Sequence, residues 1–350
     1  MEPLVLATDL CESLQRRSEP TRADQFSAIS GGVLHEDGFA VADRLAGRIY
    51  LVSVEGGVAD SIGGHGDGPG EFRSIDALYG VDSTLLAWDG SRGRMSAFTL
   101  DGELVSEHSI LPSATAQRGT RVFPAPGGGW TWMSRDFPAR REGDFRDTVL
   151  LVVTPDGSNL DTLRVVPDRW TTGFVHEGGW RAIPHLLSAE VSVASSEDGV
   201  WLVDPEASWV GLWQRPGDLP TVVQVSRAST SDVSQAVDAA RESLRRAVSA
   251  SDMASSIFAG LVDGTPARPA IPALRGAAAG TNGTVWLLEW TVSGRGGHAW
   301  EVSVDGKTTR CMAIPDDGVL LDVAGTAVLL TTTDSLGRPE VTIWGLADRP

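Results

Sequence analysis

The sequence has no long apolar run. Nothing in its 350 residues approaches the ~20 consecutive apolar residues that a membrane-spanning helix requires. The first residues, MEPLVLATDLCESL, have neither the basic region nor the apolar core of a signal peptide. We therefore expect no transmembrane segment, and these features alone leave cytoplasmic and exported locations both open.

Positive charge is also scarce. The chain has 29 Lys and Arg against 46 Asp and Glu, which gives a formal net charge of -17, and no basic run interrupts the acidic average. Because nucleic-acid binding depends on Lys and Arg neutralising phosphates, this balance excludes a nucleic-acid partner. It also disfavours an anionic membrane surface, while a protein partner or a small ligand stays compatible with it.

Cysteine is nearly absent, with only Cys11 and Cys311. Two cysteines are too few for a disulfide framework, and their spacing fits no zinc motif. We expect two separate buried thiols. The alternative is a bridge that joins the two ends of the chain.

Catalytic motifs are missing as well. The sequence contains no G-x-S-x-G, no recurring Trp-Asp signature of WD repeats and no repeated sialidase Asp-box. We therefore name no catalytic residue, no metal ligand and no cofactor, with Ca²⁺ as the one alternative. We therefore predict that this acidic protein is not an enzyme, with enzymatic activity as the alternative.

One short pattern does recur six times, as a run of Val, Leu, Trp or Ala that ends in an acidic residue. The spacings between the acids are 46, 47, 68, 85 and 45 residues, so three of the five are almost equal. The runs are GFAVAD ending at Asp43, TLLAWD at Asp89, WTWMSRD at Asp136, GVWLVD at Asp204, TVWLLE at Glu289 and AVLLTTTD at Asp334.

Each run is preceded by one short strand-like segment and followed by others, with Gly-containing turns between them such as Asp101-Gly102 and Asp305-Gly306. Four antiparallel strands repeated six times at about 45 residues are typical of a six-bladed β-propeller, an all-β fold in one domain. The predicted blades cover about 26–64, 73–110, 120–166, 188–226, 270–314 and 317–346.

The last blade lacks its fourth strand, because the chain ends at Pro350. We expect the apolar run Leu4 to Leu10 to supply it and so to close the ring. Between blades 4 and 5, residues 228–269 are predicted to form a helical insert of one or two helices, with Ser231 and Asp232 as N-cap candidates.

The chain resembles the bacterial six-bladed propellers related to NHL-repeat proteins. The resemblance depends on GGHGDGPGEF at Gly63 to Phe72, on PALRGAAAGTNGTVWLLEW after the insert, and on DSLGRPEVTIWGL at Asp334 to Leu346, and it covers nearly the whole chain. It implies a periplasmic or extracellular protein, which could be a subunit of an envelope complex. It implies little about activity.

Three groups of residues are candidates for function. The Gly-rich loop could cradle phosphate, but no Lys and no helix follow it, so we expect a structural joint between blades 1 and 2. Its residues are Gly63, Gly66, Gly68, Pro69, Gly70 and Phe72. The six repeated acids could hold Ca²⁺, but one acid in every blade indicates bonding to each local turn.

The third group lies in the blade 3 to blade 4 linker, Pro167 to Leu187, with a charged turn before it at Arg140 to Arg146. Clustered aromatic and His residues on a long loop indicate either binding or local packing. The predicted ligand- or partner-binding residues are Trp170, Phe174, His176, Trp180 and His185, together with Arg241 and Arg245 of the insert.

Two functions remain. The preferred one is a non-enzymatic scaffold that docks a protein partner or ligand on the face that carries the blade-to-blade loops. The alternative is a metal-dependent hydrolase or lyase like the gluconolactonase-type propellers, for which the only argument is fold analogy and the abundance of acids.

Overall fold

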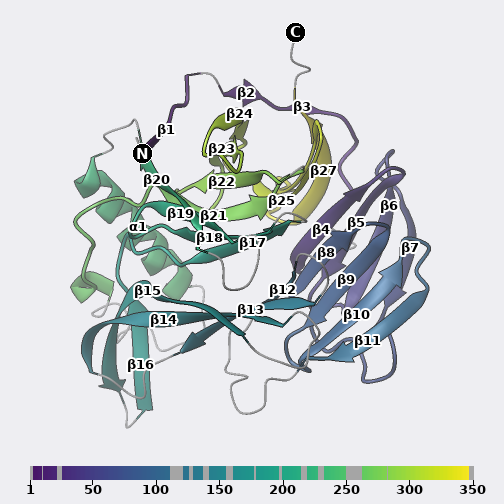
Figure 1. Cartoon of the computed structure of the whole chain (residues 1–350), viewed down its shortest axis with the longest axis horizontal. Coiled ribbons are helices and arrows are strands. Elements are labelled where there is room, and N and C mark those ends of the chain that lie inside the picture. The colour runs from purple at the N-terminus through teal and green to yellow at the C-terminus, as the bar shows by residue number, and fades with distance from the viewer. Residues whose placement is uncertain are drawn as a thin grey trace.

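The described strands form six separate sheets arranged in a ring, as Figure 1 shows for the computed structural model. The residues that the structure describes are 3–9, 11–21, 26–110, 121–125, 129–136, 142–154, 161–176, 179–196, 199–213, 219–227, 232–249, 262–281 and 283–346. In each sheet, consecutive strands of the chain are neighbours and run antiparallel. This arrangement confirms the predicted all-β propeller.

We number the sheets as blades 1 to 6 in chain order. The strands of blades 1 to 3 are β4 (Ile29–His35), β5 (Gly38–Asp43), β6 (Arg48–Ser53), β7 (Val58–Gly63), β8 (Ala77–Val81), β9 (Thr84–Asp89), β10 (Arg94–Thr99), β11 (Leu104–Ser109), β12 (Arg121–Pro124), β13 (Trp130–Asp136), β14 (Gly143–Thr154), β15 (Asp161–His176) and β16 (Gly179–Pro184). Blade 3 therefore has five strands, and blades 1 and 2 have four each.

Blades 4 to 6 include short strands from the beginning of the chain. Their strands are β17 (Ser192–Ser196), β18 (Gly199–Asp204), β19 (Trp209–Trp213), β20 (Thr221–Arg227), β21 (Leu274–Ala279), β22 (Val285–Glu289), β23 (Gly297–Val302), β24 (Thr308–Ile314), β25 (Val319–Ala324), β26 (Ala327–Thr333) and β27 (Pro339–Gly345), with β1 (Leu4–Leu6), β2 (Glu12–Ser13) and β3 (Gln15–Arg16) at their outer edges.

The acid-ending runs form the second strand of each blade. All six residues of β5 and all six of β18 are buried, including the terminal Asp43 and Asp204. A strand in this position has a neighbouring blade on each side, so both of its faces are covered. This double coverage is why these runs are continuously apolar and do not alternate.

The first strands of the six blades form the inner ring. Each of β4, β8, β12, β17, β21 and β25 contacts the first strand of the next blade, and β25 contacts β4, so the ring is closed. Close approach requires small residues here, because a Cβ atom on Gly80 of β8 would lie 2.6 Å from Cγ1 of Val33 in β4.

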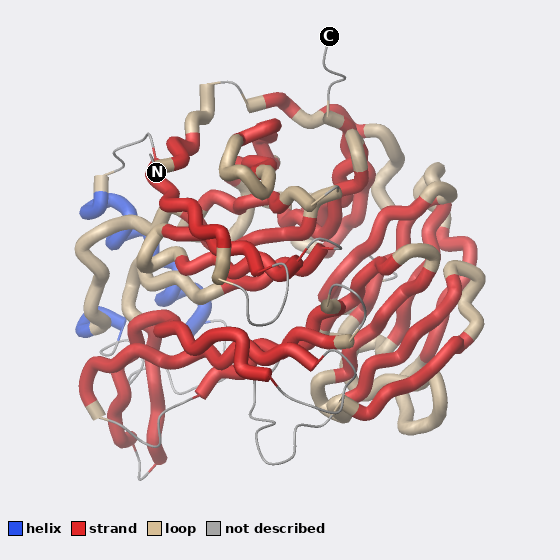
Figure 2. Tube along the Cα trace, in the orientation of Figure 1, coloured by secondary structure: helices blue, strands red, loops and turns tan. Residues whose placement is uncertain are grey.

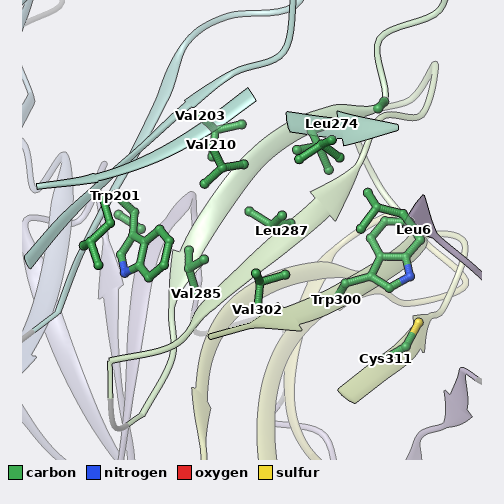
Figure 3. Close-up of a cluster of buried hydrophobic side chains, with 14 residues drawn as sticks. Leu6, Trp201, Val203, Val210, Leu274, Val285, Leu287, Trp300, Val302 and Cys311 are labelled. Atoms are coloured by element: carbon green, nitrogen blue, oxygen red, sulfur yellow. The ribbon is translucent and has the colours of Figure 1, made fainter. Parts of the chain in front are cut away.

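Six clusters of buried apolar side chains hold neighbouring blades together, one at each junction of the ring. Between blades 4 and 5, Trp201 and Val203 of β18 belong to the same buried cluster as Val285, Leu287 and Trp300 of blade 5 (Figure 3). The side chains of both Trp residues are only 1 % exposed. The core is thus divided into six inter-blade wedges.

The ring is closed by a strand from the N-terminal segment, but not by the residues that the sequence suggested. Leu4–Leu6 pairs in parallel with β20 of blade 4, and Glu12–Ser13 pairs in parallel with β24 of blade 5. The antiparallel partner of β27 in blade 6 is Gln15–Arg16, continued by a bridge between Thr21 and Val341. The predicted closing strand, Leu4 to Leu10, was therefore wrong, because Leu6 is buried between blades 4 and 5.

The expectation of two separate thiols was also wrong. Cys11 and Cys311 form a disulfide, with their Cα atoms 4.5 Å apart. Cys11 lies between β1 and β2, and Cys311 belongs to β24, beside which the N-terminal segment runs. The bridge links residues 300 positions apart and fixes the N-terminal segment to the outside of blade 5.

The described part of the insert contains the 17-residue helix α1 (Val233–Ser249), at the left edge of the ring in Figure 2, and residues 262–264 are helical as well. Asp232 caps it, because its Oδ1 accepts a hydrogen bond of 2.8 Å from the backbone N–H of Ser234. Ser231, the other N-cap candidate, lies outside the described residues. No described helix is long and apolar enough to cross a membrane.

Candidate functional site

Blade 3 extends beyond the other blades as a three-stranded flap. The last residue of β13, Asp136, pairs with Thr148, so the start of β14 continues past the end of β13 and pairs with β15 as far as Gly173. We refer to residues 143–147, 167–176 and 179–184 as the flap, which lies below α1 in Figure 1. The sequence predicted a charged turn at Arg140 to Arg146 and a loop at Pro167 to Leu187. The described parts of both are largely β-structure.

The end of the flap meets the end of the helical insert. Leu186 and Ala267 form a parallel bridge. In it, the N–H of Leu186 donates to the carbonyl of Pro266 at 2.8 Å, and the N–H of Arg268 donates to the carbonyl of Leu186 at 2.9 Å. Because the strands of each blade alternate in direction, both connections lie on the face that carries the turns after the repeated acids. We refer to it as the loop face.

Trp170 of β15 is the centre of this junction. The His185 ring stacks on it, with centroids 6.0 Å apart and an angle of 26° between the planes. The guanidinium carbons of Arg268 and Arg146 lie 4.7 Å and 6.0 Å from the indole centroid. The junction therefore joins an aromatic pair to two cations, a contact that is strongest for Arg on Trp.

His185 is buried and bonded to two polar groups of the flap. Its Nε2 lies 3.0 Å from Oγ1 of Thr172 and 3.2 Å from Oδ1 of Asp144, and the His185 side chain is only 5 % exposed. The Thr172 hydroxyl donates to the same Asp144 oxygen at 2.6 Å. This bond, followed by the hydrogen bond to His185, lowers the pKa of Asp144.

A second carboxylate orders the other side of the junction. Oε1 of Glu206 accepts hydrogen bonds from the Ser188 hydroxyl at 2.8 Å and from the N–H of Ala189 at 3.3 Å. Its Oε2 lies 3.4 Å from Nε of Arg268. The Ser188 hydroxyl in turn accepts a bond of 2.8 Å from the N–H of Trp170. Strand β15, the β18–β19 turn and the end of the insert are thus held in one network.

Of the predicted binding residues whose side chains are described, the structure brings together two, Trp170 and His185. Phe174 is half-buried in β15, and the side chains of His176 and Trp180 lie outside the described part of the chain. Arg241 and Arg245 make ion pairs with acids of their own helix, and Arg245 also pairs with Asp263 at 2.5 Å. These pairings stabilise the insert.

Sequence reasoning missed the polar residues of the junction, which are Asp144, Arg146, Thr172, Glu206 and Arg268. They come from β14, β15, the β18–β19 turn and the end of the insert, so no local motif contains them. The one available signal was the long spacings on either side of Asp204, which mark both connections that meet here.

The Gly-rich loop has a different kind of geometry. Phe72 is fully buried and packs on Phe98, with ring centroids 6.0 Å apart, in the cluster between blades 1 and 2. Gly63 has a φ of 81°, which a residue with a side chain rarely adopts. The loop therefore turns the chain sharply and inserts Phe72 between the blades.

The polar groups of this loop are bonded internally. The N–H of Gly68 donates to Glu71 at 2.7 Å, and the N–H of Gly70 donates to Glu107 at 3.0 Å. Arg94 donates to the carbonyls of Gly68 and Glu71 and pairs with Glu107 at 3.1 Å. A phosphate cradle needs converging free N–H groups, whereas two of the N–H groups here are used by carboxylates of the protein.

The repeated acids bond to their own blades. Asp43, fully buried, accepts hydrogen bonds from Leu45 and Ala46 in its turn and from Ala28 before β4. Asp89 accepts from the N–H groups of Arg73 and Arg92 in the same way. These contacts agree with the turn-binding interpretation. Burial raises the pKa of Asp204, and the Asp136 side chain lies outside the described residues.

Among the repeated acids whose side chains the structure describes, Glu289 is the one that also holds a histidine. Its Oε2 accepts from the N–H of His298 at 2.9 Å and lies 2.7 Å from Nδ1 of the same residue. The Glu289 side chain is 5 % exposed and that of His298 is 31 % exposed. Among the described residues, no group of three or more His, Cys, Asp or Glu side chains is placed to hold a metal ion.

Comparison with known proteins supports the fold. No family model matches the sequence, and no curated protein matches it. A solved protein described as exported, from Bacteroides fragilis, has a TM-score of 0.52 at 11% identity and covers 99% of both chains.

Two further solved structures have lower scores. A DUF4221 family member from Bacteroides vulgatus has a TM-score of 0.44 at 8% identity and covers 98% of each chain. Streptogramin B lyase has a TM-score of 0.41 at 12% identity, over 94% of this chain and 97% of its own. At these identities the likeness concerns the β-propeller fold alone.

Proposed function

We propose that this protein is a non-enzymatic binding propeller, related to the NHL-repeat propellers, which docks a partner or ligand on its loop face. The observation that carries the proposal is the junction of flap and insert. Two long connections, from either side of blade 4, meet there around Trp170. Rigid scaffolds commonly carry their binding residues on such extensions.

The disulfide supports a periplasmic or extracellular location. Such bridges persist in oxidising compartments and are rare in the reducing cytosol. The solved Bacteroides fragilis structure described as exported agrees with this location. Mass spectrometry of alkylated protein taken directly from cells tests the proposal: an intact bridge between Cys11 and Cys311 supports export, and fully alkylated thiols contradict it.

The binding role is tested by comparing capture of the same partner by three proteins. The first is the complete chain, the second lacks Ser231 to Val262, and the third carries Lys307→Gln in the β23–β24 turn, at the opposite end of blade 5 from the loop face. Partners are cross-linked in intact cells of the source organism and identified by mass spectrometry.

We expect the complete chain and the Lys307→Gln variant to capture the same partner, and the deletion to lose it. Thermal unfolding of the deletion variant must show one cooperative transition, so that a loss of capture reports on binding and not on folding. Equal capture by all three proteins contradicts a role for the insert, and no reproducible partner contradicts the binding proposal itself.

A metal-dependent hydrolase or lyase is the second candidate, and one observation favours it. Glu289 bonds Nδ1 of His298 and leaves the Nε2 side of a partly exposed ring available, which is how carboxylates orient metal-binding histidines. Elemental analysis of chelator-free protein distinguishes the candidates. A stoichiometric divalent metal that is lost in His298→Gln supports the enzyme, whereas metal-free protein without a thermal shift on adding Ca²⁺ or Zn²⁺ contradicts it.

A further inference from the structure

Arg268 is held in place from both of its ends. Its backbone is fixed by the bridge to Leu186, in which its N–H donates at 2.9 Å. Its guanidinium lies over Trp170, with Nε facing Glu206. A guanidinium that is ordered before a ligand arrives loses little freedom on binding, so its position favours recognition.

The terminal nitrogens of Arg268 differ from those of the neighbouring arginine. Arg146 donates to the carbonyls of Asp168 at 2.9 Å and Pro167 at 3.3 Å, so it is bonded within the flap. For Arg268, the only described ionic partner is Glu206, which approaches Nε. Among the described residues, neither terminal nitrogen of Arg268 has a hydrogen-bond partner, although its side chain is 28% exposed.

Near Trp170 the flap also has a carboxylate, Asp144, and a hydroxyl, Thr172, which can form hydrogen bonds with uncharged hydroxyl groups of a ligand. Asp144 has a side chain that is 52% exposed and accepts from Thr172, and both groups adjoin His185, which stacks on Trp170. A carboxylate and a hydroxyl in this position match the hydroxyl groups of a polar ligand. The site thus combines one cationic fork with groups suited to alcohols.

We propose that Arg268 binds the carboxylate of a hydroxylated organic acid, with the hydroxyl groups of the ligand directed to Asp144 and Thr172. Two parallel N–H···O bonds from a guanidinium fit a planar carboxylate. Glu206 lies beside Arg268 and the chain has a net charge of -17, so a singly charged carboxylate is repelled less than a phosphate dianion. The inference rests on the binding role proposed above and specifies its ligand.

The test uses glucuronate, with glucose as its neutral counterpart and inorganic phosphate as the competing anion. Isothermal titration measures each affinity for the complete chain at low salt. Two variants report on the fork: Arg268→Lys keeps the charge but cannot form the bidentate contact, and Arg268→Gln removes the charge. Lys307→Gln, in the β23–β24 turn at the opposite end of blade 5 from the loop face, is the control.

We expect glucuronate to bind the complete chain and the Lys307→Gln variant equally. Since a hydrogen bond to a charged group contributes about 1.5–3 kcal/mol, its affinity should fall at least ~10-fold in Arg268→Lys and further in Arg268→Gln. Glucose and phosphate should bind at least ~10-fold more weakly than glucuronate. Thermal unfolding of each variant shows that the loss of affinity is not a loss of the fold.

Three outcomes overturn the inference: no binding of glucuronate, binding that Arg268→Gln leaves unchanged, or glucose or phosphate binding as well as glucuronate. If partner capture still depends on the insert while glucuronate fails, the ligand class is wrong and the binding role stands. If both fail, the proposed function fails with it.

Discussion

Two connections on the loop face each contain an arginine, and the two arginines differ in how many of their nitrogens are bonded to the protein. At the Gly-rich loop between blades 1 and 2, Arg94 is 7% exposed and is bonded to two loop carbonyls and to Glu107. At the junction of flap and insert, Arg268 has one ionic partner among the described residues and lies over Trp170. A junction whose arginine has both terminal nitrogens bonded to the protein serves the fold, whereas one that leaves these donors available can serve a ligand.

The strongest test of this difference is the removal of the buried ring at the Gly-rich loop. Phe72→Ala should lower the free energy of unfolding by about 3–5 kcal/mol, because a fully buried ring between two blades leaves a cavity. Urea denaturation measures the loss. Val105→Ala, on an exposed position of β11, should change stability by no more than about 0.5 kcal/mol. A loss below about 1 kcal/mol for Phe72→Ala contradicts the structural role.

The two arginines can be compared directly. Arg94→Gln should cost about 2–3 kcal/mol of unfolding free energy, because it removes buried charge-assisted bonds and leaves the Glu107 carboxylate without its cationic partner. Arg268→Gln should cost no more than about 1 kcal/mol, since its one ion pair is partly exposed. Urea denaturation of both variants under one condition gives the difference, and similar losses for the two sites would refute the comparison.

Backbone conformation gives a smaller effect within the Gly-rich loop. Gly63→Ala should cost about 1–3 kcal/mol, because φ is 81° and the added Cβ would lie 2.8 Å from the Phe72 ring. Gly64→Ala is the matched control, since no atom lies within 4 Å of its Cβ position. Thermal unfolding of both variants measures the difference in stability between them. Equal stability of the two variants would show that the loop relaxes around an added side chain, and would contradict the prediction.

The smallest predicted effect concerns pH at the flap. The pKa of Asp144 is lowered in the folded protein, mainly by the bond from Thr172, so Asp144 stabilises the fold above its ordinary pKa of 3.8. This stabilisation is lost as the pH falls below 3.8 and through the lower folded pKa. Because the side chain is half-exposed, it should not exceed about 1 kcal/mol.

Asp144→Asn checks this sign. The variant should be less stable than the original protein at pH 7, and the difference should shrink as the pH is lowered through the acidic range. Urea denaturation at several pH values gives the profile. A difference that grows at low pH would show that Asp144 is destabilising in the folded state.

Much of the fold could be predicted because each blade repeats one local pattern. The runs GFAVAD and GVWLVD are fully buried as second strands, and their terminal acids bond to their turns, as the sequence indicated. The fourth strand of blade 6 could not be predicted in detail. Leu4 to Leu6 has the stronger apolar pattern, but Leu6 is buried between blades 4 and 5, and the polar pair Gln15–Arg16 closes the ring.

The candidate site was predictable only in part. Trp170 and His185 stood out because aromatic and His residues are clustered in an irregular connection, and the structure stacks them together. Arg268 and Glu206 had no such signal. They lie 62 residues apart in the chain, and only the folding of blade 4 brings the turn after Asp204 beside the end of the insert.

The sequence by itself determined the number of repeats, the antiparallel order of the first three strands in each repeat and the burial of the second strands, because these depend on local periodicity and turn residues. Only the tertiary structure decided which edge each N-terminal residue joins, that Cys11 meets Cys311, and that Arg268 lies over Trp170 with free terminal nitrogens among the described residues. Those contacts join distant parts of the chain, and their specificity arises from the geometry of the closed ring.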